Sequence, residues 1–200
     1  MPSTLSRRIS VATAALVTAA ILTACSTGSD DSMPSMDAGG TSMSSDMATG
    51  SVQEDDVMFA QMMIPHHEQA VEMADMALDK ATSSAEVRQL AVDIKAAQDP
   101  EIETMRGWLE AWGAPQEAPS AMEHDSGMMA DTDMSALAEA EGTEFDQMWL
   151  TMMIEHHEGA ITMARDVQST TEDEEVAALA EDIIAAQEAE IATMQTLLEP

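Results

Sequence analysis

The chain contains one sequence segment twice, and this duplication limits the possible folds more than any other feature. Residues 58–74 read MFAQMMIPHHEQAVEMA, and residues 148–164 read MWLTMMIEHHEGAITMA. A second pair of similar segments follows at almost the same spacing, EVRQLAVDIKAAQDPEIETMRGWL at residues 86–109 and EVAALAEDIIAAQEAEIATMQTLL at residues 175–198. A repeat of about 90 residues is too long for a solenoid unit. We therefore predict two copies of one helical hairpin.

Four long helices are predicted from the spacing of apolar residues and from the abundance of Ala, Glu, Gln, Met and Leu. Strand signals are weak, because the chain has no tyrosine and few runs of β-branched residues. The connections within each hairpin are short, which predicts antiparallel pairs of helices. The helices are expected at residues 53–80, 84–112, 142–168 and 173–198.

The predicted fold is therefore all-α, a four-helix bundle in a single domain at residues 53–200. Hairpin 1 is expected at residues 53–112 and hairpin 2 at residues 142–200. The linker at residues 113–141 is long enough to cross the length of a bundle. Gly113, followed by Pro115, marks the end of the second helix.

The N-terminal segment predicts export. Arg7 and Arg8 precede an apolar stretch, and residues 22–25 read Leu-Thr-Ala-Cys, which resembles the lipobox of bacterial lipoproteins. We expect residues 1–24 to be a signal peptide and Cys25 to carry a lipid that anchors the protein in the cell envelope. An ordinary signal peptide with a chance cysteine is the alternative. Residues 25–52, rich in Ser, Gly and Met, are expected to form a disordered tether.

The charge of the chain limits its partners. It has 38 acidic and 7 basic residues, for a formal net charge of −31. This balance argues against nucleic acid and against an anionic membrane surface, so the lipid anchor is the only expected membrane contact. Cys25 is the only cysteine. A site for a soft metal ion in the folded domain must therefore use methionine sulfur.

The duplicated motif contains the candidate metal ligands. On a helical projection, His66 lies in the middle of the apolar stripe of its helix, and His67 lies at the edge of that stripe. Imidazole and thioether groups together suit copper. We predict metal binding by two equivalent sets of residues. These are His66, His67, Met62, Met63 and Met73 in the first copy, and His156, His157, Met152, Met153 and Met163 in the second.

The second helix of each hairpin carries polar residues within its own apolar stripe. These auxiliary residues are Gln98 and Glu101 in one copy and Gln187 and Glu190 in the other. A buried carboxylate is costly unless it is paired or bound to metal. The two glutamates are therefore expected either to hydrogen-bond the imidazoles or to ligate metal directly.

The alternative for these residues is that they only pack the core. A histidine on an apolar stripe is usually a core residue, and methionine at helical spacing usually fills a core. The duplication of the whole pattern favours metal binding over that alternative.

The two motifs together resemble a known family. Met-Ile-x-His-His-x-x-Ala, a following Met-Ala, and then Ala-x-x-Ile-x-x-x-Gln-x-x-Glu-Ile-x-x-Met are similar to the bacterial domain-of-unknown-function family 305 over residues 55–112 and 144–198. The resemblance implies a ferritin-like four-helix bundle. It also implies kinship with exported, methionine-rich copper-binding proteins that are associated with copper tolerance, and it points to the same ten histidines and methionines.

The preferred functional prediction is an envelope-anchored lipoprotein that binds copper for sequestration, tolerance or delivery. Cu(I) is the expected form, Cu(II) is left open as a second form, and a copper donor or acceptor protein is a potential partner. Catalysis is not expected, and the sequence does not indicate an oligomeric state. The alternatives are a ferritin-like metal-dependent oxidase and a metal-free helical scaffold or interaction module. Against the oxidase, the helices lack the Glu-x-x-His pairs that a di-iron site uses.

Overall fold

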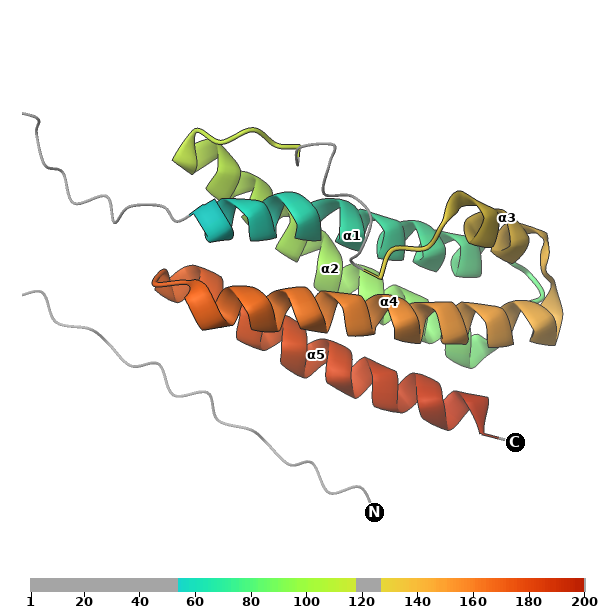
Figure 1. Cartoon of the computed structure of the whole chain (residues 1–200). Coiled ribbons are helices and arrows are strands. Elements are labelled where there is room, and N and C mark those ends of the chain that lie inside the picture. The colour runs from blue at the N-terminus through green and yellow to red at the C-terminus, as the bar shows by residue number, and fades with distance from the viewer. Residues whose placement is uncertain (1–53, 118–126, 200) are drawn as a thin grey trace, which may run out of the picture. The chain divides into compact units, whose positions relative to one another are not determined.

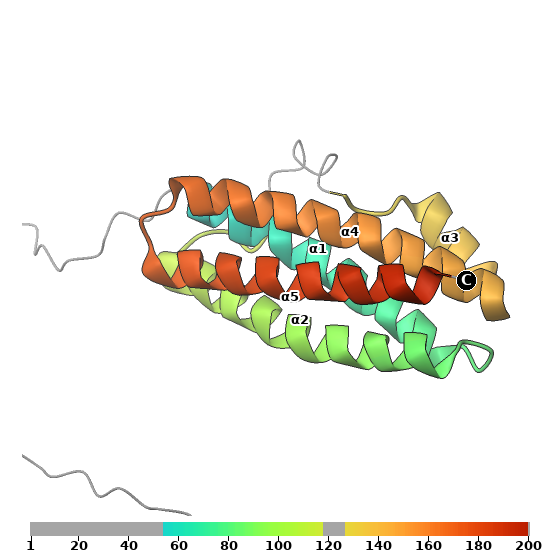
Figure 2. The ribbon, with the colours of Figure 1, turned by 90° about the horizontal axis from the view of Figure 1, so that it is seen from below.

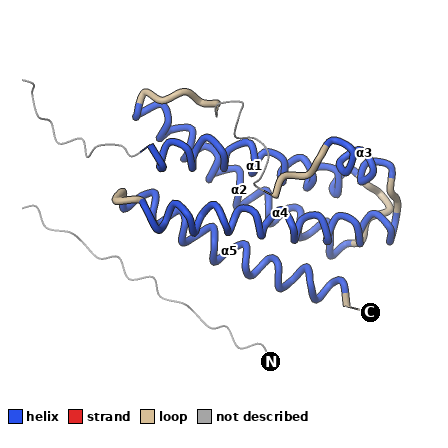
Figure 3. Tube along the Cα trace, viewed as in Figure 1, coloured by secondary structure: helices blue, strands red, loops and turns tan. Residues whose placement is uncertain are grey.

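The structure, a computed structural model, describes residues 54–117 and 127–199, so the predicted signal peptide, Cys25 and the tether lie outside the described residues. The described residues form five α-helices and no strand, which confirms the all-α prediction (Figures 1 and 3). The helices are α1 (Glu54–Asp79), α2 (Ala85–Trp112), α3 (Asp131–Glu139), α4 (Gly142–Thr170) and α5 (Glu174–Leu198). No helix in this part of the chain is long and apolar enough to cross a membrane.

Local signals explain where the long helices begin and end. The Ser84 side chain caps α2 by accepting a hydrogen bond from the Val87 amide, and the Asp173 carboxylate caps α5 in the same manner. Gly113 ends α2 in the left-handed conformation, with a φ angle of 68° that favours glycine. The four predicted helices match α1, α2, α4 and α5 closely.

Helix α3 lies within the predicted linker and was not predicted. Its buried residues are Met134 and Leu137, which belong to the same apolar cluster as Phe145 at the start of α4. Two apolar positions are too few to show a helical period in the sequence, so the helix became evident only from its packing.

The two ends of the linker that the structure describes are fastened to α1. Gln61 Nε2 donates to the Pro115 carbonyl at 2.8 Å. Gln69 Nε2 donates to the Met129 carbonyl at 2.9 Å, and the Met129 amide donates back to Gln69 Oε1 at 2.7 Å. The linker ends are thus attached to α1 on both sides of the His66–His67 pair.

The helices pack as two hairpins that meet along one seam. Helix α1 packs along α2, α4 packs along α5, and the contact between α1 and α4 joins the hairpins (Figures 1 and 2). Helices α1 and α4 run antiparallel and lie side by side in both views. Because they are the equivalent helices of the two repeats, an approximate two-fold axis relates the hairpins. We call this contact the α1–α4 seam.

The apolar core consists of two clusters at the two ends of the seam. One contains Met73, Phe145 and Trp149, together with the buried residues of α3. The other contains Phe59 and Met63 of α1 together with Ala160, Ala164 and Val167 of α4. Along every long helix, the buried residues that lie between the two clusters have polar side chains and belong to the duplicated motifs.

Candidate metal centre

A layer of polar side chains crosses the middle of the bundle, between the two apolar clusters. Each long helix contributes two of its members. The members are His66, His67, Gln98, Glu101, His156, His157, Gln187 and Glu190. The four histidines and both glutamines are at most 2% exposed. We call this set the central polar layer.

The histidines of the two repeats meet at the seam. The ring centroids of His66 and His156 lie 3.7 Å apart, with an angle of 37° between the ring planes. Within each helix, the adjacent rings are more widely separated: His66 and His67 lie 6.4 Å apart, as do His156 and His157. This contact across the seam was not predicted from the sequence. Its signal was the duplication, because equivalent residues of two repeats meet at the two-fold axis that relates them.

The outer histidine of each pair is hydrogen-bonded to a glutamate. His67 Nε2 lies 2.8 Å from Glu101 Oε2, and His157 Nε2 lies 2.7 Å from Glu190 Oε2. The two glutamate side chains keep 15% and 16% of their surface exposed. This partial exposure lowers the cost of a carboxylate at the edge of a core.

The structure shows how His67 is covered. The residue was expected at the edge of the apolar stripe, and its side chain is fully buried. The reason is that α2 packs over this side of α1 and places Glu101 against the His67 ring. Position on a single helix does not reveal which neighbouring helix covers it.

The glutamates also determine which imidazole nitrogen is available. A carboxylate accepts a hydrogen bond, so the bonded Nε2 of a neutral His67 or His157 carries the proton, and Nδ1 keeps its lone pair. Both Nδ1 atoms are buried and have no hydrogen-bond partner among the described residues. A buried, unpaired nitrogen with a free lone pair suits a metal ligand.

The interior keeps the central histidine neutral. Burial lowers the pKa of His156 well below its ordinary value, and the positive charges that His66, His157 and His67 would carry lower that pKa further. A neutral imidazole is the form that binds metal. His156 is therefore available as a neutral ligand at physiological pH.

The predicted methionine ligands do not gather in one place. Met63 is buried in one apolar cluster, and Met73, Met152 and Met153 are buried in the other. Met62 and Met163 are only half-buried and line a pocket at the surface of the seam. The structure thus divides the ten predicted ligands among the polar layer, the two clusters and the surface.

The donor groups of the layer bear on the choice of metal. Within residues 54–117 and 127–199, no group of three or more His, Cys, Asp or Glu side chains is arranged to hold a metal ion. Besides the two glutamates that bond to His67 and His157, the layer offers imidazole nitrogens, with thioether sulfurs in the adjoining turns. Such donors suit a soft ion such as Cu(I) better than iron or magnesium.

The fold and the layer define a class of protein: a bundle of two duplicated helical hairpins with paired histidines buried at its centre. The chain belongs to the family described as "Domain of unknown function (DUF305)", whose sequence profile matches residues 56–198. This result confirms the resemblance noted in the sequence. Among curated proteins, none matches the chain.

Solved structures of the same family are similar to this chain. A DUF305 fragment from Deinococcus radiodurans is 32% identical, with a TM-score of 0.67, and the match covers 73% of this chain and 96% of that one. A DUF305 protein from Streptomyces coelicolor is 35% identical, with a TM-score of 0.67 and coverage of 72% and 90%. CopM in the Cu(I)-bound form is 38% identical, with a TM-score of 0.62 and coverage of 72% and 96%. CopM is also solved in Cu(II)-bound, silver-bound and apo forms.

Proposed function

We propose that this protein is an exported copper-binding lipoprotein that holds Cu(I) in the central polar layer, for sequestration or for delivery to another protein. The observation that carries the proposal is the pair of buried His67 and His157 rings, each fixed by a glutamate at Nε2 with Nδ1 left unpaired. The copper-bound structures of CopM support the choice of metal, at 38% identity for the Cu(I) form and 35% for the Cu(II) form.

Within this proposal, the residues of the layer have distinct roles. The four histidines supply nitrogen donors in an interior that excludes water. Glu101 and Glu190 hold His67 and His157 in one orientation and one tautomer, which raises the basicity of the ligating nitrogen. Met63 and Met153 are buried and lie one turn before His66 and His156. Their position in the sequence thus suits their thioethers to join the histidines in binding Cu(I).

A carrier function fits these donors better than oxidase chemistry. Carboxylate-bridged di-iron sites use several core glutamates together with histidines. The two glutamates of the layer are each engaged with a histidine and lie at its edges. The interior donors are therefore nitrogens and sulfurs, which suit Cu(I) without carboxylate bridging.

A competition titration tests the proposal. The exported domain would be titrated with Cu(I) in the presence of a chromophoric Cu(I) chelator, and in parallel with Cu(II), Zn(II) and Fe(II). We expect Cu(I) to be withdrawn from the chelator and the other ions to bind more weakly. A double variant, His67→Gln with His157→Gln, keeps an amide donor for each glutamate and should lose the layer site while remaining helical by circular dichroism. If the unaltered domain does not compete for Cu(I), the proposal is wrong.

The membrane anchor is a separate part of the proposal, since Cys25 lies outside the described residues. Its support is the sequence at residues 22–25 and the apolar segment before it. Mass spectrometry of the processed chain should show a lipid on Cys25. The variant Cys25→Ser should release the protein from the membrane fraction, whereas a soluble unmodified wild-type protein would contradict the anchor and leave the copper proposal intact.

A further inference from the structure

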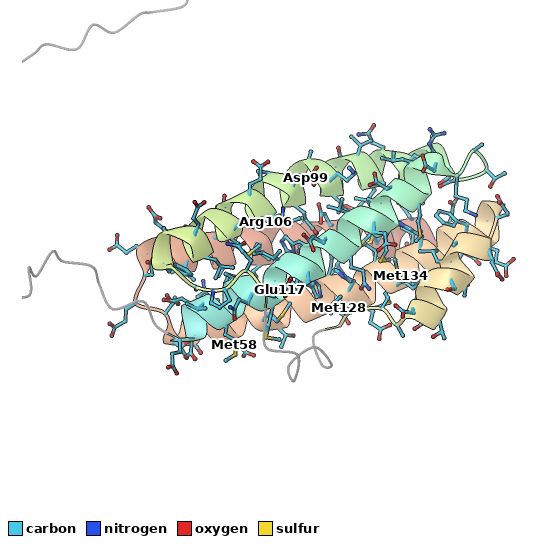
Figure 4. The ribbon with its side chains drawn as sticks, turned by 90° about the horizontal axis from the view of Figure 1, so that it is seen from above. Met58, Asp99, Arg106, Glu117, Met128 and Met134 are labelled. Atoms are coloured by element: carbon cyan, nitrogen blue, oxygen red, sulfur yellow. The ribbon has the colours of Figure 1, made fainter. Side chains whose placement is uncertain are left out.

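A pocket of about 280 Å³ opens on the surface of the α1–α4 seam, outside the central polar layer. Its walls come from the first turns of α1 and the last turns of α4, and they include three methionines, Met58, Met62 and Met163. Two aspartates, Asp55 and Asp166, also line it. Figure 4 shows Met58 on the first turns of α1, beside α4. We call this feature the Met pocket.

The helical spacing directs these side chains to one place. Met58 and Met62 are separated by four residues and therefore lie on one face of α1. The antiparallel α4 brings Met163 to the same face, and all three methionines are half-buried rather than enclosed in the core. A solute that enters the pocket can therefore meet the side chains of all three methionines.

The carboxylates of the Met pocket are exposed and lack a cationic partner. Neither Asp55 nor Asp166 takes part in an ion pair in the part of the chain that the structure describes. Two unpaired carboxylates at a pocket attract cations and raise their local concentration. Soft thioethers behind them select a soft cation.

The duplication provides an internal comparison for this pocket. At the opposite end of the seam, Phe145 and Trp149 occupy the positions equivalent to Asp55 and Phe59, and both aromatic side chains are fully buried. Trp149 Nε1 donates to the Met73 carbonyl at 2.8 Å, and Lys80 Nζ lies 5.5 Å from the centroid of the Phe145 ring. That end is filled by aromatic groups and carries a lysine.

The two ends of the seam show when methionines only pack and when they line an open pocket. Methionines also occupy the equivalent positions at the filled end, namely Met148, Met152 and Met73. Methionine alone is therefore compatible with simple packing. The Met pocket differs because aspartate replaces Phe145 and Lys80 has no basic counterpart there, Thr170 taking its place. The end of the seam that holds the Met pocket is therefore open and is lined by aspartates and methionines.

We propose that the Met pocket is a second metal site, a surface site for a soft monovalent cation such as Cu(I), with Met58, Met62 and Met163 as thioether ligands and with Asp55 and Asp166 as the groups that attract the ion. The inference rests on the proposed copper-binding function, because it gives that function a place where the ion first meets the protein. Met62 lies one turn before His66 on α1, so the Met pocket adjoins the part of the seam that leads to the central polar layer.

The test uses Ag(I), which mimics Cu(I) without redox chemistry, and the exported chain labelled with ¹³C at the methionine methyl groups. On titration, the methyl signals of Met58, Met62 and Met163 should shift. The variant Met58→Leu with Met163→Leu keeps the side-chain volume and should bind one fewer Ag(I) ion per chain. The matched control, Met76→Leu with Met148→Leu, changes two half-buried methionines at the filled end and should bind as the wild type does.

The outcomes distinguish the two proposals. In the variant His67→Gln with His157→Gln, the Met pocket should still bind Ag(I) while the layer site is lost. Unshifted signals from Met58, Met62 and Met163, with the layer occupied, would overturn the Met pocket and leave the proposed function standing. Equal losses in the Met58/Met163 variant and its Met76/Met148 control would also overturn it. A wild-type protein that binds neither Ag(I) nor Cu(I) would overturn both proposals.

Discussion

The imidazole rings of His66 and His156 contact each other at a centroid separation of 3.7 Å, although the residues belong to different copies of the repeat. Two neutral rings can lie this close inside a protein, but two imidazolium ions would repel each other and would lose their hydration. The contact therefore disfavours a charge on both rings, and protonation of the buried His156 should destabilise the fold.

The first prediction is that the metal-free protein loses stability as the pH falls below the ordinary histidine pKa. Because burial lowers the pKa of His156 in the folded state, the unfolded chain binds more protons near pH 6.5 than the folded chain does. The free energy of unfolding should thus decrease as the pH falls from about 7 towards 5, by up to about 1.4 kcal/mol per pH unit for one such group. Urea unfolding at a series of pH values measures this slope.

The variant His156→Gln provides the comparison for that slope. It removes the titrating group and keeps a polar side chain of similar size, so the dependence on pH should be shallower. A slope that is the same in the variant and in the wild type would show that His156 does not cause the pH effect.

The second prediction concerns Glu101 and Glu190. If they orient His67 and His157, changing both glutamates to glutamine should weaken Cu(I) binding by about 10- to 100-fold with the fold intact. If they only tolerate partial burial, the same change should leave affinity unaltered and should be neutral or stabilising. Chelator competition and thermal melting would be measured on the same preparations.

Glu68 and Glu158 offer the matched control for this change. Both follow the His-His pair in the motif, and both are exposed. Glu68 forms its ion pair with Arg106 at the surface. The double change of these two residues to glutamine should leave the affinity for Cu(I) unchanged, so a loss there as large as that of the first variant would indicate a general charge effect.

The helices were predictable from the sequence because their signals are local. The apolar period fixed α1, α2, α4 and α5, and Gly113 marked the end of α2 by a conformation that glycine favours. Helix α3 was missed because its only buried apolar side chains, Met134 and Leu137, show too little periodicity. A short helix is stabilised by its neighbours more than by its own pattern.

The candidate site was predictable as a set of residues but not as an arrangement. The sequence placed His66 and His156 inside the bundle, yet their contact depends on how two helices cross. Met62 and Met152 occupy equivalent positions in the repeat, but Met62 borders a pocket and Met152 is buried. Helical position predicts which side chains share a face, whereas the neighbouring elements decide whether that face is covered.

The third prediction concerns the buried methionines Met63 and Met153. Changing both to leucine conserves the volume, so the free energy of unfolding should change by less than about 1.5 kcal/mol. If their sulfurs help the central polar layer to bind the ion, the affinity for Cu(I) should fall in this variant. Any binding of Zn(II) should be unaffected, because thioethers prefer the softer ion. Competition titrations with both metals check this. Unchanged Cu(I) affinity would show that these two methionines only fill the core.

The fourth prediction concerns the place where the linker crosses α4. Gly127 has a φ of 77°, and a Cβ atom added there would lie 2.9 Å from the Cα atom of Gly159. Gly127→Ala should therefore destabilise the domain by about 1–2 kcal/mol from the backbone conformation, with a further cost from the contact. Gly107, in the last two turns of α2, is the control, since an added Cβ there meets nothing within 4 Å. Gly107→Ala should stabilise the domain by about 0.5–1 kcal/mol, because alanine favours the helix. Urea unfolding of the two variants should give changes of opposite sign, and equal stability of Gly127→Ala and the wild type would mean that this part of the linker is not held against α4.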